Sequence, residues 1–424
     1  MVFGGYSLGW SSYPYDEWRL MQMAILIALT TCLPLLSKPA LSSPAKWGLL
    51  VLNLSIPIHT ILYQPHSNLS TLLCIFVLML NVIIFYSPYL TNRLTQYALA
   101  IIAITPILTT MWLPIETVLL VLQPDIATQT AWTGSFLNIR QYDDVVLPLI
   151  FLLLSLKLGK RFTLFAIIAT TLMLWGSIQN GARAFFISLA IGISITMVLQ
   201  KQWRWSTPLL SSLVIASAVF AASILFLQQT PLKSLARSGS SGRIQIWSQA
   251  LHSWMQHPLL GSKIPNEYQP VLHPHNFVLQ MLADYGVIGI FILGGFGLLL
   301  LKIIKNRNHM PPLLLAGTIA ISCNSLFSGS MVYPQAQMAN MLFIMWALSH
   351  IPSITTIQAP IQTQNHKLLK TSTIIVTLLL FSLQFSNLSM WNSESQPPDL
   401  IQSKAVFAPF VWQYGSTQQL HSYP

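Results

Sequence analysis

Charged side chains are scarce in this sequence. Only 7% of its 424 residues are Asp, Glu, Lys or Arg, whereas 53% are hydrophobic, and the mean hydropathy is +0.60. A soluble domain ordinarily has about a quarter of its residues charged. The composition therefore excludes an ordinary soluble domain and indicates a polytopic membrane protein.

Cysteine and several well-known catalytic motifs are also rare or absent. The three cysteines, Cys32, Cys74 and Cys323, fall within apolar runs, so we expect neither a disulfide framework nor a cysteine metal site. The sequence has no Gly-x-x-x-x-Gly-Lys-Ser/Thr phosphate loop, no His-Glu-x-x-His and no Gly-x-Ser-x-Gly. ATPase and hydrolase functions thereby lose their usual support.

Apolar runs fill most of the chain. A helix that crosses a bilayer needs about 20 predominantly apolar residues, and the sequence offers twelve candidates. They are Arg19–Leu36, Gly48–Tyr63, Leu69–Tyr86, Thr95–Leu122, Val145–Leu158, Phe162–Ser177, Ala182–Leu199, Pro208–Phe226, Phe277–Leu301, Pro312–Phe327, Gln335–His350 and Thr371–Leu388. We predict an all-α integral membrane protein of about twelve transmembrane helices with one long loop that carries short helices.

The charges orient these helices, because cytoplasmic loops retain Lys and Arg. Alternate loops on one side carry thirteen basic and no acidic residues, and the other side carries eight basic and all ten acidic residues. The thirteen are Lys38, Lys46, Arg93, Lys157, Lys160, Arg161, Lys201, Arg204, Lys302, Lys305, Arg307, Lys367 and Lys370. The net charge of +11 therefore indicates topology, and we expect no nucleic-acid partner. The amino terminus falls outside by the same count, which suggests an upstream helix that this chain lacks.

Four parts follow from this topology. We expect an N-terminal transmembrane bundle at 1–227, an outer loop at 228–276, further transmembrane helices at 277–388 and an outer tail at 389–424. The loop is the long polar interruption of the chain, and we expect catalysis there.

The outer loop contains an amphipathic run. Ile244, Trp247, Leu251 and Trp254 recur at helical spacing, which predicts a short helix along the membrane face. The segment His273-Pro274-His275-Asn276 then leads directly into the next span. Arg243, at the start of the helix, and His275 are therefore both expected near the membrane interface.

Each of these polar residues has a plainer interpretation. Arg243 could simply contact lipid phosphates, and Arg183 and Arg140, at the outer ends of spans, could reach toward the interface. His273 and His275 lack a third ligand at metal-binding spacing, so we expect no metal. Together, however, outer arginines and a histidine suggest a site for an anionic, membrane-borne substrate such as a pyrophosphate-linked lipid.

A series of motifs between Gly242 and Gly289 resembles a known family. They are Gly242-Arg243 followed by Trp247, then His257-Pro258-Leu259-Leu260-Gly261, His275-Asn276-Phe277-Val278-Leu279-Gln280 and Asp284-Tyr285-Gly286-Val287-Ile288-Gly289. The order and spacing are similar to those of the bacterial superfamily of O-antigen ligases, O-antigen polymerases and protein O-oligosaccharyltransferases. The rest of the chain matches only as a many-span membrane protein with an arginine after a Gly-Ala turn.

The resemblance implies an inner-membrane glycosyltransferase that moves a glycan from undecaprenyl pyrophosphate to a hydroxyl acceptor at the periplasmic face. By its motifs, Arg243 and Arg183 would bind the donor pyrophosphate, with Arg140 as a weaker choice, and His275 would be the base. Asn276 would orient His275 or the substrate, and His273 is a second candidate base. The reaction would invert the anomeric centre and need no cofactor.

The acceptor stays open at this stage. An outer carboxyl-terminal tail favours a protein acceptor such as a pilin, as in protein oligosaccharyltransferases, over the lipid A core that an O-antigen ligase uses. A polysaccharide polymerase is the first alternative. A transporter of lipid-linked sugars would also need outer arginines, but it should show paired broken helices or mid-membrane acids. In a non-catalytic scaffold the arginines and the histidine would be incidental.

Overall fold

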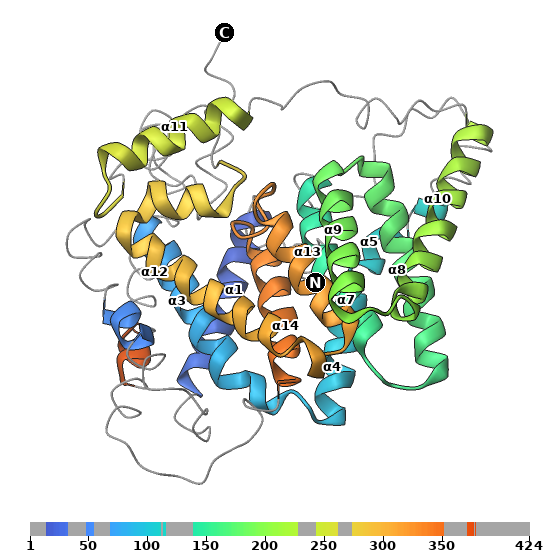
Figure 1. The fold of residues 1–424 in the computed structure, drawn as a ribbon, viewed down its shortest axis with the longest axis horizontal. Helices are drawn as coiled ribbons and strands as arrows, with labels where there is room; N and C mark the ends of the chain where they lie inside the picture. The colour runs from blue at the N-terminus through green and yellow to red at the C-terminus, as the bar shows by residue number, and fades with distance from the viewer. Residues whose placement is uncertain are drawn as a thin grey trace, which may run out of the picture. The chain divides into compact units, whose positions relative to one another are not determined.

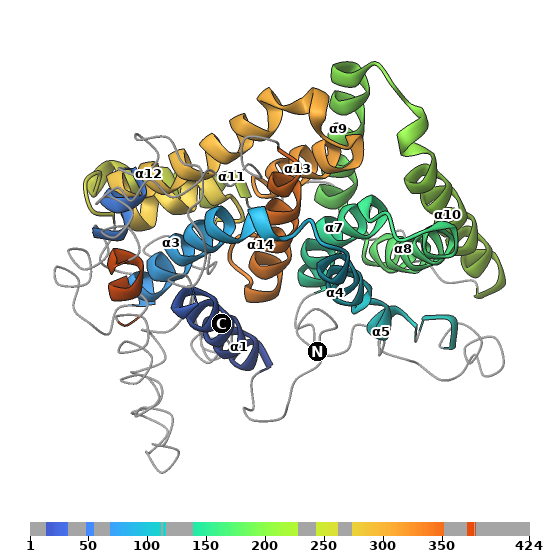
Figure 2. The ribbon, with the colours of Figure 1, turned by 90° about the horizontal axis from the view of Figure 1, so that it is seen from below.

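The computed structural model describes residues 14–32, 48–54, 68–111, 113–115, 139–227, 243–261, 274–351, 371–376 and 378. Every regular element in these ranges is a helix (Figures 1 and 2). The chain divides into two compact units, each built from separate stretches of sequence. Unit 1 takes in 89–240 and 303–351, and unit 2 takes in 11–88 and 241–302, besides terminal residues in each.

Six helices among the described residues are long and apolar enough to cross a membrane. They are Leu72–Tyr89, Arg93–Ile115, Lys160–Asn180, Arg183–Gln200, Arg204–Ser223 and Phe277–Lys305, and Trp18–Thr31 and Pro312–Asn324 are shorter apolar helices. The helical membrane class is confirmed. The count of twelve spans stays a prediction, because parts of Gly48–Tyr63 and Thr371–Leu388 lie outside the described residues.

Unit 1 is a helix bundle around α7 (Ile139–Ser155), which packs against α8 (Lys160–Asn180), α13 (Pro312–Asn324) and α14 (Pro334–Ser349). Further elements of the unit are α4 (Arg93–Ile104), α5 (Ile107–Thr110), α9 (Arg183–Gln200) and α10 (Thr207–Leu227). The sequence predicted one span over Thr95–Leu122, but α4 ends before Pro106, which cannot donate a helical hydrogen bond.

Small residues bring α9 and α13 together, and the two helices lie side by side in Figures 1 and 2. A Cβ atom on Gly192 would lie 2.4 Å from the carbonyl oxygen of Ala316 and 2.9 Å from the Cβ of Ala320. Membrane helices attract one another mainly through such close packing, because lipid offers no hydrophobic gain. The absence of a side chain at Gly192 therefore sets the distance between these helices.

Polar contacts tie α7 to its neighbours. The Tyr142 hydroxyl donates to the carbonyl of Met173 on α8 at 3.1 Å, and the Trp346 indole of α14 donates to the Ser155 hydroxyl at 2.9 Å. All four residues are buried. Buried donors need partners in an apolar interior, so these bonds fix how α7, α8 and α14 pack.

Charges separate between the two ends of unit 1. Where α7 begins, the Asp143 carboxylate accepts hydrogen bonds from Asn180, the last residue of α8. At the other end of the bundle, Gln200 at the end of α9 donates to the carbonyl of Arg307 at 2.7 Å. The second end carries the basic residues Lys160 and Lys201. That the acidic end faces outward remains a prediction from the loop charges.

Unit 2 contains α1 (Pro14–Thr31), α3 (Asn68–Tyr86), α11 (Arg243–Gln256) and most of α12 (Phe277–Lys305), and residues 48–54 are also helical. The Tyr86 hydroxyl joins α3 to α1 by donating to the carbonyl of Leu29 at 2.6 Å. Phe277, the first residue of α12, packs against Phe76 of α3 and Phe296 of α12 itself, with ring centroids 5.4 and 5.8 Å apart.

Helix α12 is broken. Gly286 has φ 54° and ψ −127°, outside helical geometry, so two helices meet at this residue, and Figure 1 shows the bend. The sequence predicted a single span over Phe277–Leu301, and that prediction is wrong in its continuity. The part that follows Gly286 has about 19 residues and a rise of 1.5 Å per residue, which is still long enough for a bilayer.

Candidate functional site

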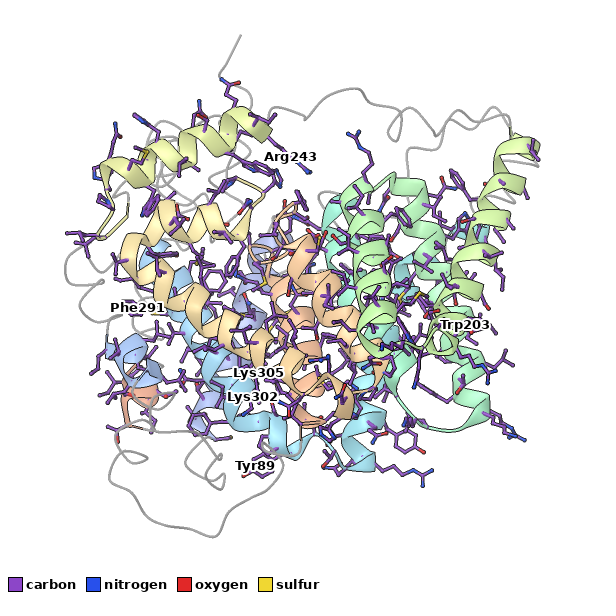
Figure 3. All side chains as sticks on the ribbon, in the orientation of Figure 1. Tyr89, Trp203, Arg243, Phe291, Lys302 and Lys305 are labelled. Carbon is purple, nitrogen blue, oxygen red and sulfur yellow. The ribbon has the colours of Figure 1, made fainter. Side chains whose placement is uncertain are left out.

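Helix α11 presents Arg243 at its first position. One face of the helix is buried through Ile246, Ala250 and Ser253, and Arg243 is half-buried beside it. Backbone N–H groups at a helix start favour anions, and a guanidinium adds a forked donor. In unit 2, Arg243 and Lys302 lie at opposite ends (Figure 3).

The segment before α12 holds His275 between two anchored residues. The Trp247 indole of α11 donates a hydrogen bond to the carbonyl of Pro274 at 2.8 Å. On the other side, the Asn276 side chain accepts from the backbone N–H of Leu279 at 3.0 Å and so caps α12. His275 itself is half-buried and has φ 51°, a conformation that few residues other than glycine adopt.

A second contact locks the turn after α11 to the break in α12. Gly261 has φ 76°, and a Cβ atom there would lie 2.3 Å from the backbone of Asp284. A Cβ atom on Gly286 would lie 2.5 Å from the carbonyl oxygen of Pro258. The N–H of Val287 donates to the carbonyl of Leu259 at 3.1 Å, so two distant motifs form one backbone interface.

Unit 2 also contains buried polar groups. Asp284 and Tyr285, next to the break, are 1% and 0% exposed. Arg19 of α1 is also fully buried and donates to the Gln22 side chain at 2.6 Å. Tyr285 interacts electrostatically with both Asp284 and Arg19. Burying a charged residue is costly unless it is paired, and the sequence alone did not predict that Arg19 and Asp284 are buried.

In unit 1, the turn between α8 and α9 presents Arg183. Asn180 donates to both oxygens of Asp143 at 3.2 Å, and Gly181 then takes the left-handed conformation, with φ 63°, that ends α8. Arg183 begins α9 and is exposed. Asp143 thus holds Asn180, the residue from which the turn to Arg183 starts.

Its neighbour Asp144 holds a different segment of unit 1. The Asp144 carboxylate is 2% exposed and accepts from Asn324 at 2.8 Å and from Ser328 at 2.6 Å. These donors belong to the end of α13 and the turn before α14. Two adjacent buried carboxylates therefore organise separate turns at one end of the bundle.

The predicted site residues fall into both units. Arg243, His275 and Asn276 belong to unit 2, whereas Arg183 and Arg140 belong to unit 1. Arg140 lies in the first turn of α7. Its side chain and the whole of His273 lie outside the described part of the structure.

Among the described residues, no group of three or more His, Cys, Asp or Glu side chains is arranged to hold a metal ion. The Trp247 contact with Pro274 instead joins the helix that begins with Arg243 to the residue before His275. The arrangement therefore offers an imidazole and a guanidinium within one unit.

Comparison with known protein families bears directly on this region. Residues 168–294 match the family model for O-antigen ligase. This segment is similar to the O-antigen ligase family. The resemblance predicted from the motifs is thereby confirmed, and no curated protein matches the chain.

The O-antigen ligase segment includes most of α8, all of α9, α10 and α11, and α12 through its break. Arg183, Arg243 and His275 lie within it. Arg140 and the two buried aspartates of α7 lie outside it. The match supports a membrane glycosyltransferase of the O-antigen ligase type.

Sequence reasoning missed three parts of the geometry. It placed Trp247 on an amphipathic face and in the family motif without a contact, and it counted Asp143 and Asp144 only among the acidic residues of the outer side. A carboxylate pair in the first turns of an apolar helix was the available signal, because such groups need buried partners. No pattern in the sequence indicates that a tryptophan would bond to the carbonyl of Pro274.

Proposed function

We propose that the protein transfers a glycan from an undecaprenyl-pyrophosphate carrier to a hydroxyl acceptor at the periplasmic face of the inner membrane. The O-antigen ligase segment supports the reaction class. The catalytic part is residues 228–276, the loop that carries Arg243 and ends at the segment with His275.

The observation that carries this proposal is the hydrogen bond from Trp247 to Pro274. Arg243 and Trp247 are four residues apart on α11 and share one side of the helix. Pro274 directly precedes His275. The bond therefore joins the helix that begins with a cation to the residue before a titratable ring, although the two are distant in sequence.

In the proposed reaction, the neutral imidazole of His275 takes the proton from the acceptor hydroxyl. The hydroxyl oxygen forms a bond to the anomeric carbon of the glycan. The bond from that carbon to the pyrophosphate oxygen breaks, and the electron pair leaves with the carrier. Arg243 and Arg183 stabilise the departing charge, and attack from the side opposite the leaving group inverts the anomeric centre.

Three further residues complete the assignment. Arg140 is proposed as an additional donor contact, and Asn276 as the residue that fixes the backbone next to His275, since it caps α12. His273 is the alternative base. The mechanism assigns the leaving-group charge to arginines, so it includes no metal and no cofactor.

For the acceptor we propose a protein such as a pilin, with the lipid A core as the other candidate. A polysaccharide polymerase would use the same donor chemistry with a growing glycan as acceptor. The outer tail at 389–424, which supports the protein acceptor, lies outside the described residues.

A transporter of lipid-linked sugars is the second candidate function, and one observation favours it. Broken helices are typical of transporter binding sites, and α12 is broken at Gly286 beside the buried Asp284. The break is filled by the backbone of Pro258 and Leu259, however. This tight protein contact favours a structural reason for the break.

The decisive experiment is transfer by the full chain in proteoliposomes. The donor is a defined undecaprenyl-pyrophosphate oligosaccharide, and pilin or lipid A core is supplied on the side of the outer loop. His275→Ala should lower the transfer rate by about 10²- to 10⁴-fold, and Arg243→Ala should raise the donor KM. His252→Ala is the matched control, because His252 is an exposed histidine of α11.

Full transfer by His275→Ala would contradict the base assignment, and loss with His273→Ala alone would move that role to His273. Inhibition by a chelator would contradict the metal-free mechanism. Donor lipid that crosses the bilayer without any glycan transfer would establish the transporter instead.

A further inference from the structure

Trp247 links the two chemical groups of the candidate site. On α11 it lies one helical turn after Arg243, on the same side of the helix. Its indole N–H donates to the Pro274 carbonyl at 2.8 Å, and Pro274 is buried. The peptide bond that includes this carbonyl leads directly into His275.

We propose that Trp247 is a positioning residue that couples α11, and with it the donor-phosphate contact of Arg243, to the orientation of the catalytic base His275. This inference rests on the proposed function. Trp247 itself touches neither the acceptor hydroxyl nor the reacting carbon in this scheme.

The backbone of His275 needs such support. Its φ of 51° is a left-handed conformation that costs a non-glycine residue free energy, and it persists only when neighbouring contacts hold it. Asn276 provides the contact on one side by capping α12. Trp247 provides the contact on the other side, through Pro274.

The coupling has a mechanistic consequence. A general base must lie within hydrogen-bond reach of the proton that it takes, and small displacements of a catalytic group lower the rate steeply. Movement of α11 on donor binding would be transmitted to His275 through the Trp247 bond. Loss of the bond should therefore lower kcat while donor binding by Arg243 persists.

Trp254 provides a matched control on the same helix. It is half-buried like Trp247, but its indole nitrogen has no hydrogen-bond partner among the residues that the structure describes. Replacing either tryptophan by phenylalanine keeps an aromatic ring and removes one N–H group. Only at Trp247 does that change break a bond.

The test compares Trp247→Phe and Trp254→Phe in the full chain, reconstituted with the same oligosaccharide donor. Trp247→Phe should lower kcat by roughly three- to tenfold, the effect of one lost hydrogen bond, with donor KM unchanged. It should also displace the acidic limb of the kcat–pH profile, which reports the base in the enzyme–substrate complex. Trp254→Phe should leave kcat and the pH profile unchanged.

Two results would overturn the coupling. One is a wild-type kcat and pH profile for Trp247→Phe, and the other is an equal loss for both variants, which would indicate packing alone. The proposed function fails separately, when the wild-type chain transfers no glycan from the donor to any of the supplied acceptors. The coupling fails when His275→Ala is inactive and Trp247→Phe is as active as the wild type.

Discussion

Gly286→Ala tests the break in α12 and the interface built on it. At φ 54° and ψ −127° an alanine is strained, at a cost of about 1–3 kcal/mol. Its Cβ would lie 2.5 Å from the Pro258 oxygen and 2.7 Å from the Leu259 carbonyl carbon. These are backbone atoms that cannot rotate away, so overpacking adds about 1–3 kcal/mol.

The free energy of unfolding should therefore fall by about 2–6 kcal/mol. In purified, detergent-solubilised protein we expect Tm to fall by roughly 2–7 °C, because a chain of 424 residues loses about 1 °C per kcal/mol. The rate of glycan transfer should also fall, because the turn that follows α11 loses its close backbone contact with Gly286. The assays are thermal unfolding by intrinsic fluorescence and transfer from the lipid-linked donor.

Gly294→Ala is the control. Gly294 lies in the same helix, and a Cβ atom there would meet nothing within 4 Å. Alanine is the better helix former by up to about 1 kcal/mol, so Tm should stay the same or rise. An unchanged Tm and transfer rate for Gly286→Ala would refute the interlocked geometry of the turn and the break.

Two further variants test other contacts. Asn276→Ala should lower the free energy of unfolding by about 1 kcal/mol through loss of the α12 cap, and it should also lower the transfer rate. Asn276→Ser should retain most of the stability and most of the transfer rate. Equal behaviour of the two variants would contradict the cap. Gly192→Val should separate α9 from α13, because its Cβ would lie 2.4 Å from the Ala316 oxygen. A Tm equal to that of the wild type for Gly192→Val would contradict that packing.

The sequence predicted the positions of helices correctly where apolar residues form a long or regularly spaced run. The predicted spans Ala182–Leu199 and Pro208–Phe226 correspond to α9 and α10, and the amphipathic run corresponds to α11. The prediction started α7 too late, at Val145, whereas the helix begins at Ile139. Its first turns contain Asp143 and Asp144. Two adjacent carboxylates are typical of a loop, and only their buried partners explain why they lie within a helix.

The partners of those carboxylates could not be predicted. Asn324 and Ser328 are far from Asp144 in sequence, and no local pattern relates them. Pro106 and Gly286 mark positions where a helix can break, yet only the packing of Pro258 against Gly286 shows that α12 does break there. Sequence patterns report which face of a segment is apolar, and they leave its neighbours undetermined.

The sequence by itself determined the membrane class, the segregation of charge between alternate loops and the motifs that match the O-antigen ligase family. These properties depend only on which residues are present and on their order along the chain. Only the tertiary structure decided that Trp247 bonds to Pro274, that Gly261 and Gly286 share one interface and that each unit combines distant stretches. Those contacts arise because buried polar groups and close backbones need particular partners, whatever their separation along the chain.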